Sequence, residues 1–142
     1  MEQGTARTRI AANAEERFVP LRRQLGVTSF GLNQIVLRPG ERGRIHRHGS
    51  QEEVYAVLEG TLTLLVEREE SVLDRGELVR VGPESRRQLV NRGPERLVLL
   101  ALGGEGEHAG RDGEAFASWG DERGAAPQEV PLPEDLPEAE RA

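Results

Sequence analysis

Short apolar runs separated by turn residues fill most of the chain, and this pattern predicts a β-rich fold. The runs are rich in Val, Ile, Leu and Thr and lie at residues 27–38, 44–48, 53–60, 61–69, 71–73, 77–81, 87–90 and 95–104. Turn sequences made of Gly, Pro, Asn and Asp separate them. About seven or eight strands at such close spacing are typical of a sandwich or barrel, so the middle of the chain is predicted to be all-β and to lack a long helix.

The two ends of the chain differ from this middle part. Residues 1–17 are polar and predict a mobile arm or a short helix. Residues 104–142 are acidic and rich in Gly and Pro, a composition typical of an extended or disordered tail. Phe116 and Trp119 lie in this tail and predict an anchor that docks part of it against the barrel or against a second subunit.

The predicted organisation therefore has a single folded domain between an arm and a tail. This β-barrel domain covers residues 18–103, and its first segment, residues 18–26, mixes apolar and basic residues and could form an edge strand. A chain of 142 residues suits one domain with a modest core.

Composition and charge exclude several classes of function. The chain has no Cys, which rules out disulfides and thiolate chemistry, and no Lys, which rules out Schiff-base chemistry. All 19 basic residues are Arg. The net charge of −6 is uneven, because eleven acidic residues face only three arginines from Gly103 onward. A near-neutral body without a basic face or a stacking platform argues against nucleic-acid binding.

No part of the sequence is suited to a membrane or to export. The longest apolar run, Leu97 to Leu102, is far too short to span a bilayer. The first residues lack the apolar core of a secretory signal. We therefore expect a soluble cytoplasmic protein without a membrane partner.

Three residues near the middle of the chain form a candidate metal site. His46 and His48 are separated by one residue, so on a strand both imidazoles project to the same face. Glu53 begins the next predicted strand, close enough to join them. Two imidazoles and a carboxylate suit Fe(II), Mn(II), Ni(II) or Zn(II). The alternative is that the segment is an ordinary polar loop with solvated histidines.

The spacing around these residues resembles the first conserved motif of the cupin superfamily. Five residues separate Gly40 from His46, four separate His48 from Glu53, and six separate Glu53 from Gly60. The residues of the stretch EEVYAVLEG are also similar to those of small single-domain cupins. The resemblance, which covers roughly residues 27–103, implies a jelly-roll or conical β-barrel and a homodimer. It places Glu53, and not Glu52, at the ligand position.

A second cupin motif is matched in spacing but only partly in residues. Gly76 and Asn91 fit the pattern, whereas Gly82 stands where the family has Pro and Glu84 where it has Gly. Arg87 occupies the position of the third metal-binding His. The resemblance implies a metal held by three His and one Glu, but this sequence offers two His, one Glu and an Arg.

Three interpretations of Arg87 remain open. In the first, a metal binds through His46, His48 and Glu53, while Arg87 swings aside or holds the carboxylate of an anionic substrate. In the second, Arg87 replaces the metal by pairing with Glu53. In the third, the site is vestigial and the barrel has a structural or interaction role.

Other residues are predicted to lie near the site or away from it. Tyr55 and Gln34 are candidates to line the barrel interior and, with Arg87, to contact a substrate. Gln51 and Glu52 are expected on the outer surface. His108 is a candidate surplus ligand that folds back from the tail.

The sequence as a whole indicates a small cupin that binds a divalent metal and a small molecule, anionic if Arg87 faces it, in the barrel mouth. One alternative is a metal-dependent enzyme such as a dioxygenase or isomerase. Another is a non-catalytic sensing or binding module with an Arg87–Glu53 pair in place of metal. Fold alone does not choose among them, because one barrel hosts many chemistries.

Overall fold

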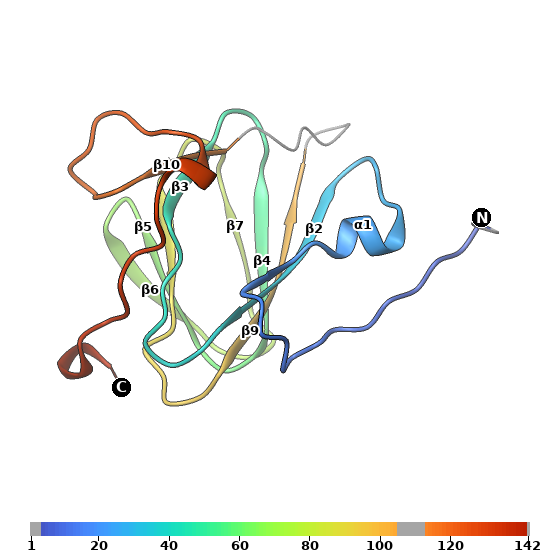
Figure 1. Cartoon of the computed structure of the whole chain (residues 1–142), viewed down its shortest axis with the longest axis horizontal. Helices are drawn as coiled ribbons and strands as arrows, with labels where there is room; N and C mark the ends of the chain where they lie inside the picture. The colour runs from blue at the N-terminus through green and yellow to red at the C-terminus, as the bar shows by residue number, and fades with distance from the viewer. Residues whose placement is uncertain (1–3, 105–112, 142) are drawn as a thin grey trace.

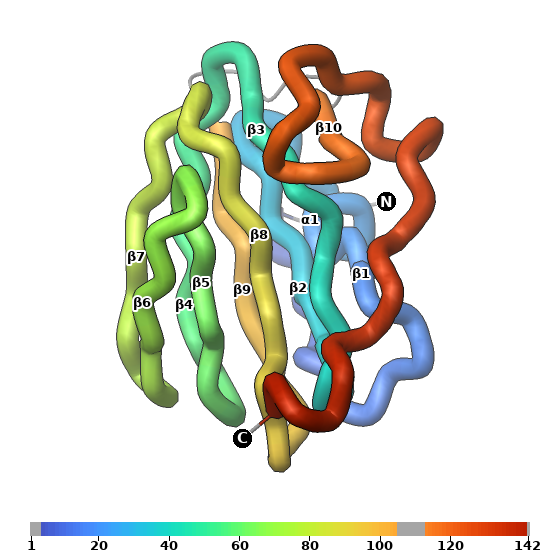
Figure 2. Tube along the Cα trace, turned by 90° about the vertical axis from the view of Figure 1, so that its left-hand side faces the viewer, coloured from blue at the N-terminus to red at the C-terminus, as the bar shows by residue number. Residues whose placement is uncertain are grey.

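The computed structural model describes residues 4–104 and 113–141. Two antiparallel sheets of five strands each pack against one another, with both ends of the chain on the outside (Figures 1 and 2). The predicted all-β fold is therefore confirmed. The first sheet has the strand order β1-β2-β9-β4-β7 and the second has the order β10-β3-β8-β5-β6.

The strands follow the predicted apolar runs closely. In the first sheet they are β1 (Phe18–Val19), β2 (Gly31–Leu37), β4 (Glu53–Glu59), β7 (Leu78–Val81) and β9 (Leu97–Gly103). In the second sheet they are β3 (Ile45–His48), β5 (Leu62–Val66), β6 (Glu69–Leu73), β8 (Arg87–Val90) and β10 (Gly113–Phe116). One helix, α1 (Leu21–Leu25), and two short 3-10 turns, η1 (Pro127–Glu129) and η2 (Glu138–Glu140), complete the elements of the described residues.

A single apolar core fills the space between the sheets. Strand alternation explains it, since Tyr55 and Val57 of β4 point inward and are buried, whereas Leu58 on the other face is exposed. Leu62, Leu64 and Leu89 meet the inward side chains of the first sheet from the second. Burial of these side chains supplies the main driving force for the two-layer fold.

Two parts of the prediction need correction. The segment 18–26 is not one edge strand, because β1 ends at Val19 and Pro20 leads into α1, which Gly26 ends in a left-handed conformation. The run 61–69 is not one strand either. Glu67 and Arg68 adopt positive φ angles and form the two-residue turn that joins β5 to β6.

The C-terminal segment adds a strand and a long strap to the second sheet. Strand β10 pairs with β3 in the register Ala115 to His46, and the chain then runs along the outside of the sheet (Figure 2). Phe116 is buried beneath the Arg86 guanidinium, 3.7 Å from the ring centroid, so it anchors the tail against the barrel as predicted. Trp119 is only half-buried.

Membrane insertion through a helix finds no support in the described residues. None of their helices has the length and apolar character needed to cross a bilayer.

Candidate metal centre

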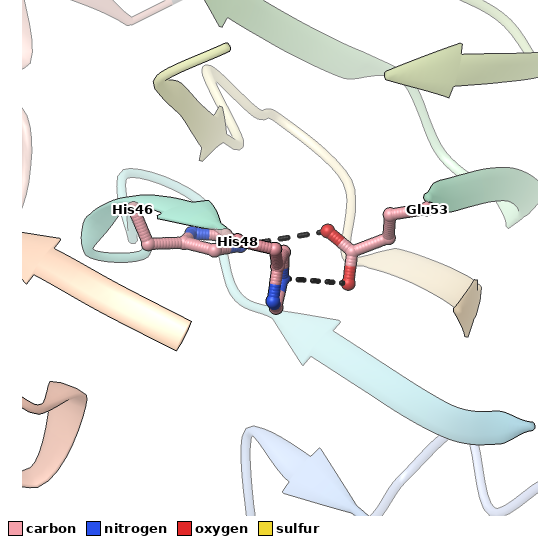
Figure 3. Close-up of side chains that lie close together, drawn as sticks. All are labelled: His46, His48 and Glu53. Carbon is pink, nitrogen blue, oxygen red and sulfur yellow. Dashed lines mark ion pairs between the residues drawn. The ribbon is translucent and has the colours of Figure 1, made fainter. Parts of the chain in front are cut away.

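His46, His48 and Glu53 meet between the two sheets. His46 and His48 lie two residues apart on β3, so both imidazoles project from the same face, and Glu53 opens β4 opposite them. The Nε2 atom of His46 lies 3.5 Å from Oε1 of Glu53, and that of His48 lies 3.6 Å from Oε2 (Figure 3). The two imidazole rings stand edge to face with centroids 5.4 Å apart.

The spacing of these three donors fits a metal ion. One ligand atom from each residue lies within 4.8 Å of the others, so this group could hold a metal. Two donors about 2.1 Å from a common metal lie about 3.0–3.5 Å apart at ordinary coordination angles, close to the imidazole–carboxylate separations here. His46 is also oriented, because its Nδ1 atom lies 3.2 Å from the Arg44 carbonyl and leaves Nε2 to face Glu53.

Arg87 lies beside this group, where it is completely buried. It is the register partner of His46 across β3 and β8. Its Nε atom lies 3.9 Å from Oε1 of Glu53, and its terminal nitrogens donate to the carbonyls of Gly82 at 2.8 Å and Pro83 at 3.4 Å. The side chain has an exposed fraction of 0%. Arg87 therefore lies against Glu53 on the side away from the cavity wall, and it is not available to a molecule in the cavity.

Tyr55 completes the surroundings of the carboxylate. Its buried hydroxyl donates a hydrogen bond to Oε1 of Glu53. Burial alone would raise the pKa of Glu53, but hydrogen bonds and charge from His46 and His48 hold that pKa well below its ordinary value. Burial, followed by the charge of Glu53, raises the pKa of Tyr55 well above 10. The site is thus arranged as an ionised carboxylate that receives donors on several sides.

The three candidate ligands form part of the wall of a cavity of about 710 Å³. This volume lies within the range of small-molecule sites. Residues of both sheets and of α1 line it, including Asn33, Ile35, Leu37, Tyr55, Leu89, Arg22 and Arg23. A ligand in this cavity would therefore contact the exposed side of the candidate metal centre.

Two predicted positions around the site are wrong. Gln34 does not line the cavity, because it lies on the outer face of β2, where its side-chain amide bonds the backbone of Ala11 at 2.7 and 2.8 Å. Gln51 is buried and lines the cavity, although the outer surface was expected. Glu52 is exposed, as predicted, and pairs with Arg80. His108 lies outside the described residues.

The sequence interpretation also missed the arginines at the cavity wall. Arg22 and Arg23 lie on α1, and Arg17 and Arg44 lie on the segments that flank β1 and β3. The only signal was the basic pair inside the apolar segment 18–26. The two arginines reach the cavity wall because they lie on a helix, and strand alternation does not predict that helix.

Comparison with known proteins agrees with this fold. A family profile described as a cupin domain matches residues 33–103, which is half of the chain. The chain belongs to the cupin family. The match contains most of β2, all of β9 and all the strands between them, and therefore the whole candidate metal centre of this cupin.

Three relatives illustrate how far the likeness reaches. The protein TcmJ, a tetracenomycin polyketide synthase protein of Streptomyces glaucescens, is 37% identical over 77 residues, 53% of this cupin and 52% of that protein. This cupin thus spans about half the length of that curated relative. The crystal structure of a cupin protein from Bacteroides fragilis is 21% identical with a TM-score of 0.62, covering 74% of this chain and 86% of that one.

A third structure, of a cupin-superfamily sugar phosphate isomerase from Silicibacter pomeroyi, is 24% identical with a TM-score of 0.59. The match covers 82% of this chain and 79% of that one. At such identities the likeness to these structures shows the fold alone.

Proposed function

We propose that this cupin binds a divalent transition metal ion through His46, His48 and Glu53 and holds a small molecule in the adjoining cavity. The observation that carries the proposal is the convergence of two imidazole nitrogens and one carboxylate on the wall of a cavity of about 710 Å³. Such a set suits Fe(II), Mn(II), Ni(II) or Zn(II), and none of these is favoured by the donors alone.

The residues around the ligands support this role. The Arg44 carbonyl orients His46, and the Tyr55 hydroxyl holds one oxygen of Glu53, so the donors are positioned before a metal arrives. A bound divalent metal would supply a Lewis acid that polarises an oxygen of the small molecule. The ligand would lie against Asn33, Gln51 and the apolar side chains of Ile35 and Leu89.

Two other functions share the same site. In one, the metal makes the protein an enzyme such as a dioxygenase or isomerase. In the other, the protein is a non-catalytic sensing module in which Arg87 takes the place of the metal. The separation of 3.9 Å between Arg87 Nε and Glu53 Oε1 favours this second alternative, because an ion pair would satisfy the carboxylate without a metal.

Metal analysis separates these functions. Protein purified without a metal-affinity tag is analysed for Fe, Mn, Ni and Zn, and we expect close to one equivalent after reconstitution. His46→Gln and Glu53→Gln should each abolish most of this binding. The matched control is Glu52→Gln, which alters the neighbouring exposed carboxylate. Less than a tenth of an equivalent in the unmodified protein would overturn the metal proposal and leave the Arg87–Glu53 pair.

For an enzyme, dioxygen consumption with small carboxylates or phenols then provides the next assay. Turnover that is lost in Glu53→Gln and kept in Glu52→Gln would identify an oxygenase. Binding of such compounds without dioxygen uptake would instead favour an isomerase or a binding module.

We also propose that the protein is a homodimer, joined through the outer face of the first sheet. Leu32, Leu102 and Val54 lie in register across this face, followed by Leu100, Ala56 and Leu78. Leu78 is 66% exposed. Contiguous apolar surface of this kind marks interaction sites.

The position of the N-terminal arm supports a second copy of this chain as the partner that covers this face. Ala11 of the arm is hydrogen-bonded to Gln34 on this face, and the arm then runs away from the body toward the N-terminus (Figure 1). In a two-fold dimer each arm could reach its partner.

The mass in solution tests the dimer. We expect twice the chain mass of 15.7 kDa by analytical ultracentrifugation, and a single-chain mass for Leu78→Glu combined with Leu100→Glu. Val72→Glu is the control, because Val72 is 58% exposed on the other sheet. A single-chain mass for the unmodified protein would overturn the dimer. The cytoplasmic location stays a prediction.

A further inference from the structure

We propose that Arg22 and Arg23 of α1 hold an anionic oxygen group, a phosphate or a carboxylate, of the small molecule that binds in the cavity. This inference rests on the proposed function in one respect, that the cavity is a ligand site. It does not require the metal. It assigns the anion to α1 and not to Arg87.

Charge pairing singles out these two residues among the arginines at the cavity wall. Arg17 pairs with Glu41 at 3.0 Å and with Asp135 at 3.8 Å. Arg44 donates from Nε to the Val130 carbonyl at 2.6 Å. Within residues 4–104 and 113–141, the guanidinium groups of Arg22 and Arg23 form no ion pair and no hydrogen bond.

The remaining arginine near the metal centre cannot perform this role. Arg87 has no exposed surface, and two backbone carbonyls already accept its terminal N–H groups. Arg87 is also absent from the wall of the cavity. The free cationic groups are therefore at the α1 end of the cavity, and guanidinium is the side chain best suited to paired hydrogen bonds with phosphate or carboxylate.

The fold places α1, and with it the backbone of both arginines, at one end of the cavity. Leu21 is buried and fixes the start of α1, while β1 pairs with β2 just before it. On the same register row Gly31 of β2, Gly103 of β9 and Glu53 of β4 lie side by side. Two strand spacings of about 4.8 Å place the Cα atoms of Gly31 and Glu53 about 10 Å apart. Since α1 packs on β2, the anion and the metal centre would contact opposite ends of one small molecule.

The lining between these ends fits such a molecule. Ile35 and Leu37 of β2 and Leu89 of β8 are apolar, whereas Asn33 and Gln51 offer polar side chains. A cavity with mainly apolar walls and a few polar groups is the usual form of a site that orients a small ligand. The ligand class is therefore a small organic molecule with a terminal phosphate or carboxylate and a metal-binding oxygen at its other end.

Anion binding to metal-free protein tests the assignment. Inorganic phosphate and acetate are titrated separately into chelator-treated protein at low ionic strength, because salt screens exposed charges. Binding is followed by calorimetry and, for phosphate, by ³¹P line broadening. We expect Arg22→Gln combined with Arg23→Gln to weaken binding of the preferred anion at least tenfold. The ratio of the two affinities then tells a phosphate ligand from a carboxylate ligand.

A matched variant controls for net charge. Arg7→Gln combined with Arg9→Gln removes the same charge from the exposed N-terminal arm, away from the cavity wall, and should leave anion binding unchanged. Arg22→Lys combined with Arg23→Lys keeps the charge and should retain part of the affinity. Equal losses in the arm variant and the α1 variant, or no anion binding by the unmodified protein, would overturn the proposal.

The two proposals about this cavity fail independently. If the protein has no metal affinity but binds an anion through Arg22 and Arg23, the metal proposal is wrong and the anion site stands. Metal binding without any effect of Arg22 and Arg23 on either anion would reject the anion site alone.

Discussion

Replacing Arg87 with His should strengthen metal binding. The substitution removes a buried positive charge next to Glu53 and puts an imidazole where the third metal-binding His stands in the cupins that this chain resembles. The position is favourable because Arg87 is the register partner of His46 across β3 and β8. The unmodified protein should therefore bind divalent metal more weakly than the variant.

The size of the effect follows from the geometry. Arg87 Nε lies 3.9 Å from Glu53 Oε1, so a metal on that carboxylate would lie roughly 5 Å from the guanidinium charge. At an effective dielectric of about 20, a divalent ion and a unit charge at that distance repel by about 6–7 kcal/mol. Loss of the Arg87–Glu53 pair and movement of solvent offset much of this energy. We therefore expect roughly a hundredfold gain in affinity, about 2.7 kcal/mol, with the added ligand included.

Competition with a chelating dye, using Zn²⁺ and Mn²⁺, measures this gain. Arg87→Leu removes the charge without adding a ligand, so it should recover only part of the gain. Arg80→His is the control, because Arg80 is exposed and pairs with Glu52. The carbonyls of Gly82 and Pro83 lose their donor in either Arg87 variant, and thermal unfolding checks that each still folds. Unchanged affinity in folded Arg87→His would refute the reasoning.

Three further predictions concern the surroundings of the carboxylate and the arm. Tyr55 is the one tyrosine of the chain, so absorbance near 295 nm reports its ionisation; we expect the midpoint well above pH 10, and a folded protein titrating near 10 would contradict the raised pKa. The pKa of Glu53 is lowered by folding, so its carboxylate stabilises the metal-free protein above about pH 4.5 and loses this effect as the pH falls further. The unfolding free energies of Glu53→Gln and of the unmodified protein should therefore converge in acid. A difference that stays constant with pH would contradict the lowered pKa of Glu53. Gln34→Met should lower the free energy of unfolding, measured with denaturant, by about 1–3 kcal/mol, because the Gln34 amide is hydrogen-bonded to the backbone of Ala11. The substitution should leave the metal affinity unchanged. A change in metal affinity would show that Gln34 acts on the metal site.

The fold was largely predictable because its signals are local. Apolar runs, alternating in β2 and β4 and continuous in β9, place these strands within a few residues of their predicted bounds. Gly60 is a clear case: it adopts a φ of +81°, and a Cβ there would lie 2.3 Å from the Arg96 carbonyl. A glycine at this point of the motif is thus a requirement of the backbone, which a sequence pattern can record.

The arrangement around the site was less predictable, because it depends on which face of a strand turns inward and on which distant segments pack together. Gln34 and Asn33 are adjacent on β2, and alternation puts one of them in the cavity, but the sequence does not tell which. The N-terminal arm decides the matter by covering Gln34. Gln51 is turned inward by a loop, and the position of β10 depends on pairing between residues distant in the chain. Such long-range choices leave no periodic signal.

Charge balance connects the metal centre to the arginines on α1. With neutral imidazoles, Glu53 and Arg87 cancel each other in the metal-free site. A divalent ion then adds two positive charges to a poorly solvated cavity wall, where unpaired charge is costly. An anionic ligand that reaches the metal at one end and Arg22 and Arg23 at the other would reduce this excess, so each ligand should favour the binding of the other. Arg87 weakens the metal site when it is considered alone, and for the same reason it makes metal binding depend on an anion. This coupling should be weaker in Arg87→His, because a neutral third imidazole leaves one excess positive charge in the metal-loaded site where the unmodified protein has two.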